Sequence, residues 1–312
     1  MVPPRFARPL LQSLLILVIS VSWLIMPATA WCQNGRAPLD DFFQNFMRMT
    51  PQQRAELQKV EVPWKVEEDQ GRQTFESYRR YLRQSDITLS DQSDDARYVQ
   101  QLVARIHPHM KHARRYRQLH VYIADSPEVD ARSIPGGYLI FYRGLLEFAE
   151  SEAALVGIIG HELSHLDRGH QLKPIRQMLQ AQRRLSRADR LNLGDFFSLG
   201  QGMMNSFHPF HPEEEEEADQ DGLQWMHQVG YDGRELARLF QRLAERPRRG
   251  AAAAMPPFLR THPLYPDRAA ATLRHLRHLQ RVAPRDDLVI GKEALAERSP
   301  AEMPDRRRRG RR

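Results

Sequence analysis

Three polar residues in a largely apolar part of the chain have the spacing of a metal site. His161, Glu162 and His165 form the motif His-Glu-Leu-Ser-His. Histidines four residues apart lie one above the other on a helix face, so both rings can reach one zinc ion. The glutamate between them would act as general base on the attacking water. Two surface histidines on an ordinary helix explain the bare motif about equally well.

The residues around the motif favour the metal site. Residues 153–166 are mostly apolar and include Gly157 and Gly160, which weaken a helix unless close packing requires them. Buried histidines need polar partners, and a metal ion is one. Cys32 is the only cysteine, so a thiolate zinc site and an intrachain disulfide are excluded. Any ligands must be histidines and carboxylates.

A catalytic zinc ion needs a third protein ligand and an open position for water. One arrangement places a histidine ten residues after the first, but Gln171 stands there, with Gly169 and His170 each one position out of place. That arrangement is excluded. The other arrangement takes a glutamate from a second helix, and residues 213–217 are five consecutive glutamates. Such a run is more often a solvated helix face.

Helical periodicity separates these glutamates. The face of Glu215 continues through mainly small and apolar residues, and that of Glu217 through polar ones. We therefore predict that Glu215 points inward as the third ligand. Asp219, one turn later, is predicted to accept the remaining ring N–H of a ligating histidine. The face of Glu215 consists of Glu215, Ala218, Asp219, Gly222, Met226 and Val229. The face of Glu217 consists of Glu217, Gln220, Asp221, Gln224 and Gln228.

Few strands are expected beside many helices. Aromatic and β-branched residues predict strands at 118–123 and 138–142, with a Pro-Gly-Gly turn at 135–137 before the second. Helical patterns predict a mainly helical α+β fold, in which a small sheet flanks the helix of the motif. The predicted helices are 51–60, 151–167, 171–204, 213–229, 234–244 and 266–282, and a further helix carries Val99, Leu102, Val103 and Ile106.

The 312 residues suit one sizeable core, and we predict four segments. Residues 1–30 resemble a signal peptide: two arginines, an apolar run and the small-residue site Ala28-Thr29-Ala30. A retained membrane anchor is the alternative, and no span is expected after cleavage. Residues 31–84 form an extension of unknown role, 85–283 the core domain, and 284–312 a basic, disordered tail. The net charge of +7 lies at the two ends, so no nucleic-acid partner is expected.

Several motifs in this order resemble the HtpX-like and CAAX prenyl protease family of zinc metallopeptidases, in particular its soluble exported branch. The resemblance covers roughly residues 90–280. Its motifs are Pro135-Gly136-Gly137, Gly144-Leu145-Leu146, the HELSH motif, Glu215-x-x-Ala218-Asp219 and Thr261-His262-Pro263. It implies a zincin-like fold in which His161, His165 and Glu215 bind one zinc ion, Glu162 is the base and Asp219 supports a ligand.

The resemblance implies further roles. A strand that includes Gly136, Gly137, Tyr138 and Leu139 would line the cleft and pair with substrate backbone, although an ordinary turn and core strand would look the same. His262 would lie near the metal, either stabilising the oxyanion or closing the open position at rest; read alone, it is an ordinary loop histidine. Arg268 would anchor the loop of His262.

This chain also departs from the family pattern. Residues 130–133 read Asp-Ala-Arg-Ser where the family commonly has Asn-Ala-Phe-Ala, and Ala154 replaces a frequent acidic residue. The metal-site residues are unaffected.

The expected function is zinc-dependent hydrolysis of peptide bonds in exported, misfolded or misassembled proteins in the periplasm. A polypeptide is then the substrate, and the outer-membrane assembly machinery is a candidate partner. The alternatives are a periplasmic chaperone or assembly factor with latent protease activity and, ranked last, an anionic-surface binder acting through the tail Arg306–Arg312.

Overall fold

The structure is a computed structural model that describes residues 50–184, 210–245, 257–263 and 268–304. The chain divides into two compact units, Met1–Glu56 and Leu57–Arg312. The described part of the first unit belongs to helix α4, Pro51–Gln58. The second unit holds the HELSH motif and every other residue of the predicted metal site. The predicted signal peptide at residues 1–30, Cys32 and the arginine tail lie outside the described residues.

The second unit is mainly helical around one small sheet, which confirms the predicted fold class. Among its described residues, the long helices that surround the sheet are joined by shorter α and 3-10 segments. Its strands are β1 Leu89–Ser90, β2 His120–Ala124, β3 Ala131–Ile134 and β4 Tyr138–Tyr142. Its helices are α5 Trp64–Gln84, α6 Asp94–Ile106, η1 His107–His109, α7 Arg143–Phe148, α8 Glu152–Arg168, η2 His170–Leu172, α9 Lys173–Arg184, α11 Pro212–Val229, α12 Arg234–Glu245, α13 Pro257–Thr261, α14 Arg268–Val282 and α15 Lys292–Glu297.

The four strands lie in the order β1-β2-β4-β3. Strand β4 pairs in parallel with β2 and antiparallel with β3, so both of its edges are occupied. This corrects the prediction that the strand after Pro135-Gly136-Gly137 pairs with substrate, because an added chain needs a free edge. Within the described residues, β3 lies next to β4 and forms that edge of the sheet. It was not predicted, because Arg132 and Ser133 interrupt its apolar pattern.

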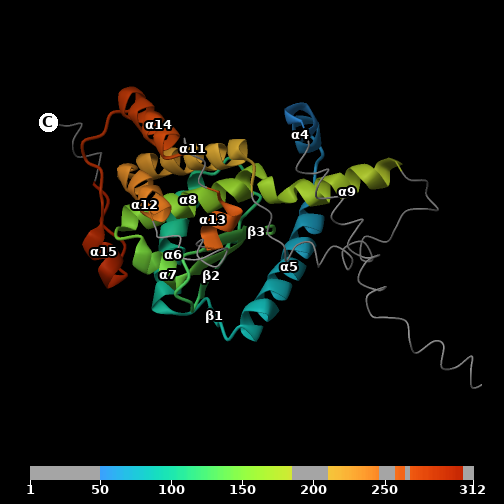
Figure 1. Cartoon of the computed structure of the whole chain (residues 1–312), viewed down its shortest axis with the longest axis horizontal. Helices are drawn as coiled ribbons and strands as arrows, with labels where there is room; N and C mark the ends of the chain where they lie inside the picture. Colours follow the sequence, from blue (N-terminus) through green and yellow to red (C-terminus); the bar gives the residue numbers. More distant parts are fainter. Residues whose placement is uncertain (1–49, 185–209, 246–256, 264–267, 305–312) are drawn as a thin grey trace, which may run out of the picture. The chain divides into compact units, whose positions relative to one another are not determined.

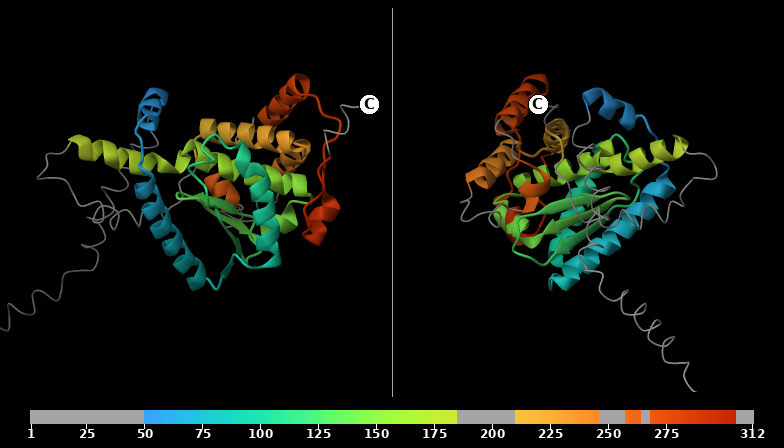
Figure 2. Two further views of the ribbon diagram at one scale, coloured as in Figure 1. Left: turned by 180° about the vertical axis from the view of Figure 1, so that it is seen from behind. Right: turned by 45° about the vertical axis from the view of Figure 1, so that its right-hand side comes forward.

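The sheet lies between two helical layers (Figures 1 and 2). Successive side chains of a strand point to opposite faces, so each layer receives alternate residues. Ile140 and Tyr142 of β4 pack against α5 through Phe75, Tyr78 and Leu82. Leu139 and Phe141 face the larger core, which α6, α8, α11 and α12 complete. The sheet therefore separates α5 from the helix that carries the HELSH motif.

Helix α8 has defined ends. The side chain of Ser151 accepts a hydrogen bond from the backbone N–H of Ala154, as an N-cap does, and Gly169 ends the helix in the left-handed region with φ 64°. All residues from Glu152 to Asp167 are buried. The helix therefore lies inside the core, which explains its almost continuous apolar sequence.

Two glycines of α8 let the neighbouring helices α11 and α12 approach closely beside the motif. A Cβ atom on Gly160 would lie 2.8 Å from the Cα atom of Gly222 in α11, and one on Gly157 would lie 2.9 Å from Leu236 in α12. Neither position accepts a larger side chain without movement of a neighbour. The structure thus meets the predicted need for close packing at these glycines. The close approach also places the inward face of α11, which carries Glu215 and Asp219, against His161.

Segments on both sides of the predicted core domain pack into the same unit. Helix α5 precedes residue 85, and its buried Glu67 accepts a hydrogen bond from the backbone N–H of Gly136 at 3.2 Å. After residue 283, the carbonyl of Gly291 accepts from the N–H of Glu152 at 3.0 Å. Residues 284–304 are therefore packed rather than disordered. No helix in the described parts of the chain is long and apolar enough to cross a membrane.

Candidate metal centre

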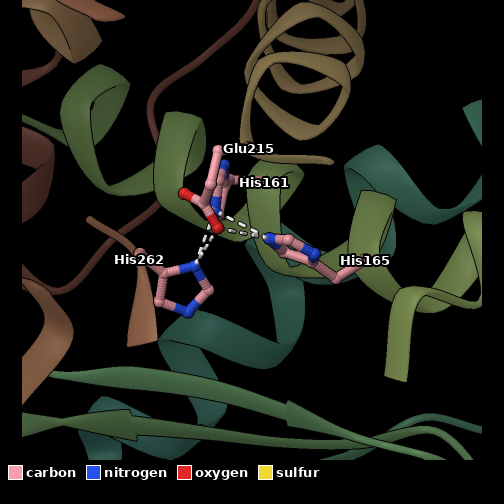
Figure 3. A group of neighbouring side chains, drawn as sticks. All are labelled: His161, His165, Glu215 and His262. Atoms are coloured by element: carbon pink, nitrogen blue, oxygen red, sulfur yellow. Dashed lines mark hydrogen bonds and ion pairs between the residues drawn. The ribbon is translucent and has the colours of Figure 1, made fainter. Parts of the chain in front are cut away.

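His161 and His165 occupy successive turns of α8, and both side chains are fully buried. Their Nε2 atoms point to the same space and lie 3.0 Å apart (Figure 3). This is the arrangement that the four-residue spacing predicts. The geometry follows from the helix itself, because residues i and i+4 lie on one face.

Glu215 reaches the two rings from the first turns of α11 and is buried, as its helical face predicts. Its Oε2 atom lies 3.6 Å from His161 Nε2, and its Oε1 atom lies 3.4 Å from His165 Nε2 (Figure 3). The side chain of Glu217 is 42% exposed and lies outside this cluster. Glu215, rather than Glu217, therefore points into the cluster.

Asp219 lies where the sequence places it, behind His161. Its Oδ1 atom is 2.9 Å from His161 Nδ1, the ring nitrogen directed away from the cluster. Arg268, from the start of α14, donates to both carboxylate oxygens of Asp219 at 2.7 and 2.9 Å. The same guanidinium lies 2.5 Å from Glu215 Oε2 and donates to the carbonyls of His262 and Pro263. Arg268 thus joins the two acidic residues to the loop.

His262 completes the cluster from the end of α13. Its Nδ1 atom lies 3.0 Å from both His161 Nε2 and Glu215 Oε1, and its Nε2 atom lies 3.3 Å from Glu162 Oε1. The ring stacks on Phe258 with centroids 4.5 Å apart. It is buried, and its position brings it close to both the predicted ligands and the predicted base.

The four residues could hold a metal ion, because one ligand atom from each lies within 4.8 Å of the others. Zinc bonds of about 2.0–2.1 Å in a tetrahedron put neighbouring ligand atoms about 3.3–3.4 Å apart. The separations in the cluster, 3.0–3.6 Å, bracket that value. When Nδ1 of His161 donates to Asp219, its Nε2 carries a lone pair that points into the cluster. A metal cation bound there would accept this lone pair.

The charge states of His165, Glu215 and Asp219 suit a metal site, whereas Glu215 and Glu162 raise the pKa of His262 against the effect of burial. Burial lowers the pKa of His165 well below its ordinary value, so the ring is neutral. Burial alone would raise the pKa of Glu215, but the charges of Arg268 and His262 hold it well below its usual range. The pKa of Asp219 is lowered in the same way, against burial, chiefly by Arg268. Neutral histidines and ionised carboxylates are the forms that bind a metal.

Two residues beside Glu162 were not predicted to take part. The hydroxyl of Ser133 in β3 donates to Glu162 Oε2 at 2.7 Å, and Gln171 Nε2 donates to the same hydroxyl at 2.6 Å. Gln171 also donates to the carbonyl of Ser133 at 3.1 Å. Ser133 replaces the usual alanine of the family pattern. This departure in the sequence could have indicated that residue 133 has a role in the site.

A second unpredicted contact lies behind His165. Its Nδ1 atom is 2.9 Å from Nδ1 of His170, whose Nε2 atom is 3.2 Å from Glu217 Oε2. The hydrogen bond from His170, together with the charge of Arg168, lowers the pKa of Glu217 against burial. The sequence indicated only that His170 is out of place for a third zinc ligand.

The predicted substrate strand is not brought into the cluster. Gly136 and Gly137 lie in the turn before β4, and the ring of Tyr138 stacks on Phe75 of α5 with centroids 4.6 Å apart. Leu139 is buried in the core. Residue 133 of the neighbouring edge strand, rather than these four, contacts the predicted base.

The fold and the residues of the cluster together are typical of a metallopeptidase. The chain belongs to peptidase family M48, because residues 93–276 match the sequence profile of that family. The match confirms the family resemblance of the motifs. In that family context, the buried histidine and glutamate cluster is a candidate metal centre for peptide hydrolysis.

The chain is also similar to curated relatives. The beta-barrel assembly-enhancing protease of Escherichia coli K12 is 23% identical over 216 residues, which cover 64% of this chain and 42% of the relative. The protein of that name from Yersinia pestis is 23% identical over 171 residues, covering 50% and 34%. A relative from Vibrio cholerae is 28% identical over 159 residues, covering 45% and 31%. The chain thus spans about a third to two-fifths of the length of these relatives.

Proposed function

We propose that the protein is a zinc-dependent endopeptidase in which His161, His165 and Glu215 hold one zinc ion. The observation that carries this proposal is the convergence of these three side chains with His262 in a buried space. When bound, zinc would lower the pKa of water and polarise the scissile carbonyl. A resident ion would also account for the close approach of the imidazole nitrogens of His161, His165 and His262.

Glu162 is the proposed general base. It is buried on the α8 turn that carries both histidines, and its Oε1 atom faces His262 while its Oε2 atom accepts from Ser133. In this role the carboxylate takes a proton from the attacking water and passes it to the leaving amine. Asp219 would fix the tautomer of His161 through the 2.9 Å contact at Nδ1.

The outer edge of β3, on the side away from β4, is the proposed substrate site. The N–H of Tyr142 donates to the carbonyl of Asp130, which defines a hydrogen-bonded pair in the antiparallel ladder. Because such pairs alternate, the backbone groups of Ala131 and Ser133 point away from β4. Ser133 also contacts Glu162, so a peptide added along this edge would pass beside the base.

The proposed substrates are exported proteins that have misfolded or failed to assemble. The names of the relatives describe proteases that enhance beta-barrel assembly, which supports this class of substrate. We place the protein in the periplasm on the same basis, together with the signal-like residues 1–30. The outer-membrane assembly machinery is the proposed partner.

The test is metal content and casein cleavage by the purified protein, compared with its Glu162→Gln variant. We expect about one zinc ion per chain in both proteins. Cleavage should fall at least about a hundredfold in the variant, because general acid–base catalysis contributes that much or more. Unchanged cleavage in the variant would rule out Glu162 as the base, and absence of zinc from the wild-type protein would contradict the zinc site.

A second function is supported by the position of His262. Its Nδ1 atom is as close to His161 and Glu215 as a fourth ligand would be, which favours a centre that is closed at rest. Such a protein could bind clients as an assembly factor and cleave them rarely. A stoichiometric client complex with little turnover, in the presence of full zinc occupancy, would favour this function over proteolysis.

A further inference from the structure

The two histidines of the HELSH motif have different partners on the side away from the cluster. His161 meets the carboxylate of Asp219 directly. His165 instead meets a second imidazole, because its Nδ1 atom lies 2.9 Å from Nδ1 of His170. The side chain of His170 is 1% exposed, so water does not compete for this contact.

The local sequence places His170 there. Gly169 ends α8 in the left-handed conformation, and the chain turns into the 3-10 segment His170–Leu172. A Cβ atom on Gly169 would lie 2.9 Å from Arg176 Nη2, so the turn is also closely packed. The reversal sets the ring of His170 at 72° to that of His165, with centroids 5.0 Å apart.

The contact continues to a carboxylate. His170 Nε2 lies 3.2 Å from Glu217 Oε2, and Arg168 Nη1 lies 3.1 Å from the same oxygen. Arg168 also donates to Asp221 of α11, which accepts from Ser164 of α8 at 2.7 Å. Residues of α8 and α11 thus hold the far end of the contact in place.

The proton positions in this chain of contacts have one consistent order. A ligand that uses Nε2 for the metal keeps its proton on Nδ1, so His165 would donate to Nδ1 of His170. His170 must then carry its own proton on Nε2, where the Glu217 carboxylate accepts it. Both rings are neutral in this arrangement, and each polar atom has a complementary partner.

We propose that His170 is a positioning residue that fixes the tautomer and ring orientation of His165, with Glu217 as its anchor. This inference rests on the proposed zinc site. Asp219 performs the corresponding role for His161 in one step, whereas His170 passes the contact on to a carboxylate that is 42% exposed. Removal of Glu217 should therefore have a smaller effect on metal binding than removal of the His170 nitrogens.

The test is the affinity of the metal-free protein for Zn²⁺, titrated against a chromophoric chelator. His170→Phe keeps a ring but removes both nitrogens, and we expect zinc affinity to fall about 10- to 100-fold. His170→Gln keeps an acceptor that can face His165 and a donor that can face Glu217. The zinc affinity of this variant should therefore lie closer to wild type. If His170 only fills space, the order reverses, because phenylalanine then replaces it better than glutamine.

Neighbouring acidic residues supply the controls. Glu217→Ala should weaken zinc binding, and Glu216→Ala, one residue away on the exposed side of α11, should leave it unchanged. Thermal unfolding of each metal-free variant shows whether the fold is retained. If His170→Phe does not fold, equal affinity in the Glu217 and Glu216 variants overturns the inference. A wild-type protein that binds no zinc would instead contradict the proposed function.

Discussion

The two nitrogens of the His262 ring face different groups, and these groups suggest opposed roles. Its Nδ1 atom faces the proposed ligands His161 and Glu215, whereas Nε2 faces the proposed base Glu162. A ring that binds the ion through Nδ1 closes the position that water and substrate need. A ring that stays free could stabilise an oxyanion instead. The separations of 3.0 Å favour the first role.

We therefore expect His262→Ala to raise casein turnover, measured at equal zinc occupancy. If the wild-type site is open a tenth of the time, the gain is about tenfold. His278→Ala, an exposed histidine of α14, is the control and should change nothing. A loss of about a hundredfold would assign His262 to oxyanion stabilisation. An unchanged rate would leave His262 as an ordinary loop histidine.

The ligand assignment has its own test at the residue scale. Glu215→Gln removes the inward carboxylate, and we expect this protein to lose zinc by elemental analysis, because a carboxamide is a much poorer zinc ligand. Glu213→Gln, in the same acidic run but on the exposed side of α11, should retain zinc. Equal zinc content in the two variants would show that the ligand is misassigned.

At the scale of elements, the edge of β3 is already partly occupied. Gln171 Nε2 donates to the outward carbonyl of Ser133, and the N–H of Ala131 donates to the side chain of Asp130. A peptide that pairs with this edge must displace the Gln171 contact, because the carbonyl of Ser133 is one of the outward acceptors. Substrate binding and the Gln171 side chain therefore compete.

We expect Gln171→Ala to lower KM for a peptide substrate and to leave kcat unchanged. One net hydrogen bond of about 0.5–1.5 kcal/mol corresponds to a fall of about two- to twelvefold. Gln100→Ala is a matched control, since Gln100 Nε2 also donates to a backbone carbonyl, that of Asp91, away from the site. A lower kcat with unchanged KM would mean instead that Gln171 holds Ser133 against Glu162.

The family departures in β3 are linked to each other. Asp130 and Arg132, which replace asparagine and phenylalanine of the common pattern, form an ion pair at 2.8 Å, and Arg132 also lies over the ring of Tyr78. Burial raises the pKa of Asp130 to about 6, although Arg132 opposes the shift. The arginine thus takes the place of an aromatic side chain against α5, and Asp130, the residue before the strand, balances its charge.

The sequence predicted what depends on local spacing. The burial of Glu215 and the contact between His161 and Asp219 follow from helical periodicity, and the apolar runs gave β2, β4 and α8. The sequence pattern did not predict strand β3 or helix α5, and the reason is the same for both. Their sequences are polar, and contacts with residues distant in the chain stabilise them. In α5, buried Glu67 accepts from Arg115 and Tyr116, and Gly71 would place a Cβ atom 1.8 Å from the carbonyl of Pro135. Neither contact can be inferred from spacing.

At the scale of the whole molecule, residues after the predicted core domain hold the start of α8. The N–H groups of Glu152 and Ala153 donate to the carbonyls of Gly291 and Ile290, each at 3.0 Å. The buried carboxylate of Glu152 accepts from the Tyr98 hydroxyl at 2.7 Å and from the Ala301 N–H at 3.0 Å. The helix that carries the proposed metal site is thus fixed at its first turn by a segment more than 130 residues later in the sequence.

Two shortened proteins test this role. A chain that ends at residue 283 loses those backbone contacts and the buried side chain of Leu295, and it leaves Glu152 with fewer partners. With about 1 kcal/mol for each hydrogen bond and about 2 kcal/mol for the leucine, we expect unfolding to become easier by about 3–5 kcal/mol. That is a large share of the roughly 5–15 kcal/mol that stabilises a typical domain.

A chain that ends at residue 304 keeps all of these contacts and should match the full-length protein. The measurement is the urea midpoint of each protein with zinc removed, followed by zinc affinity of those that remain folded. Equal midpoints for the two shortened proteins would show that residues 284–304 do not stabilise α8, and a loss of stability on removal of 305–312 alone would assign that role to the arginine tail.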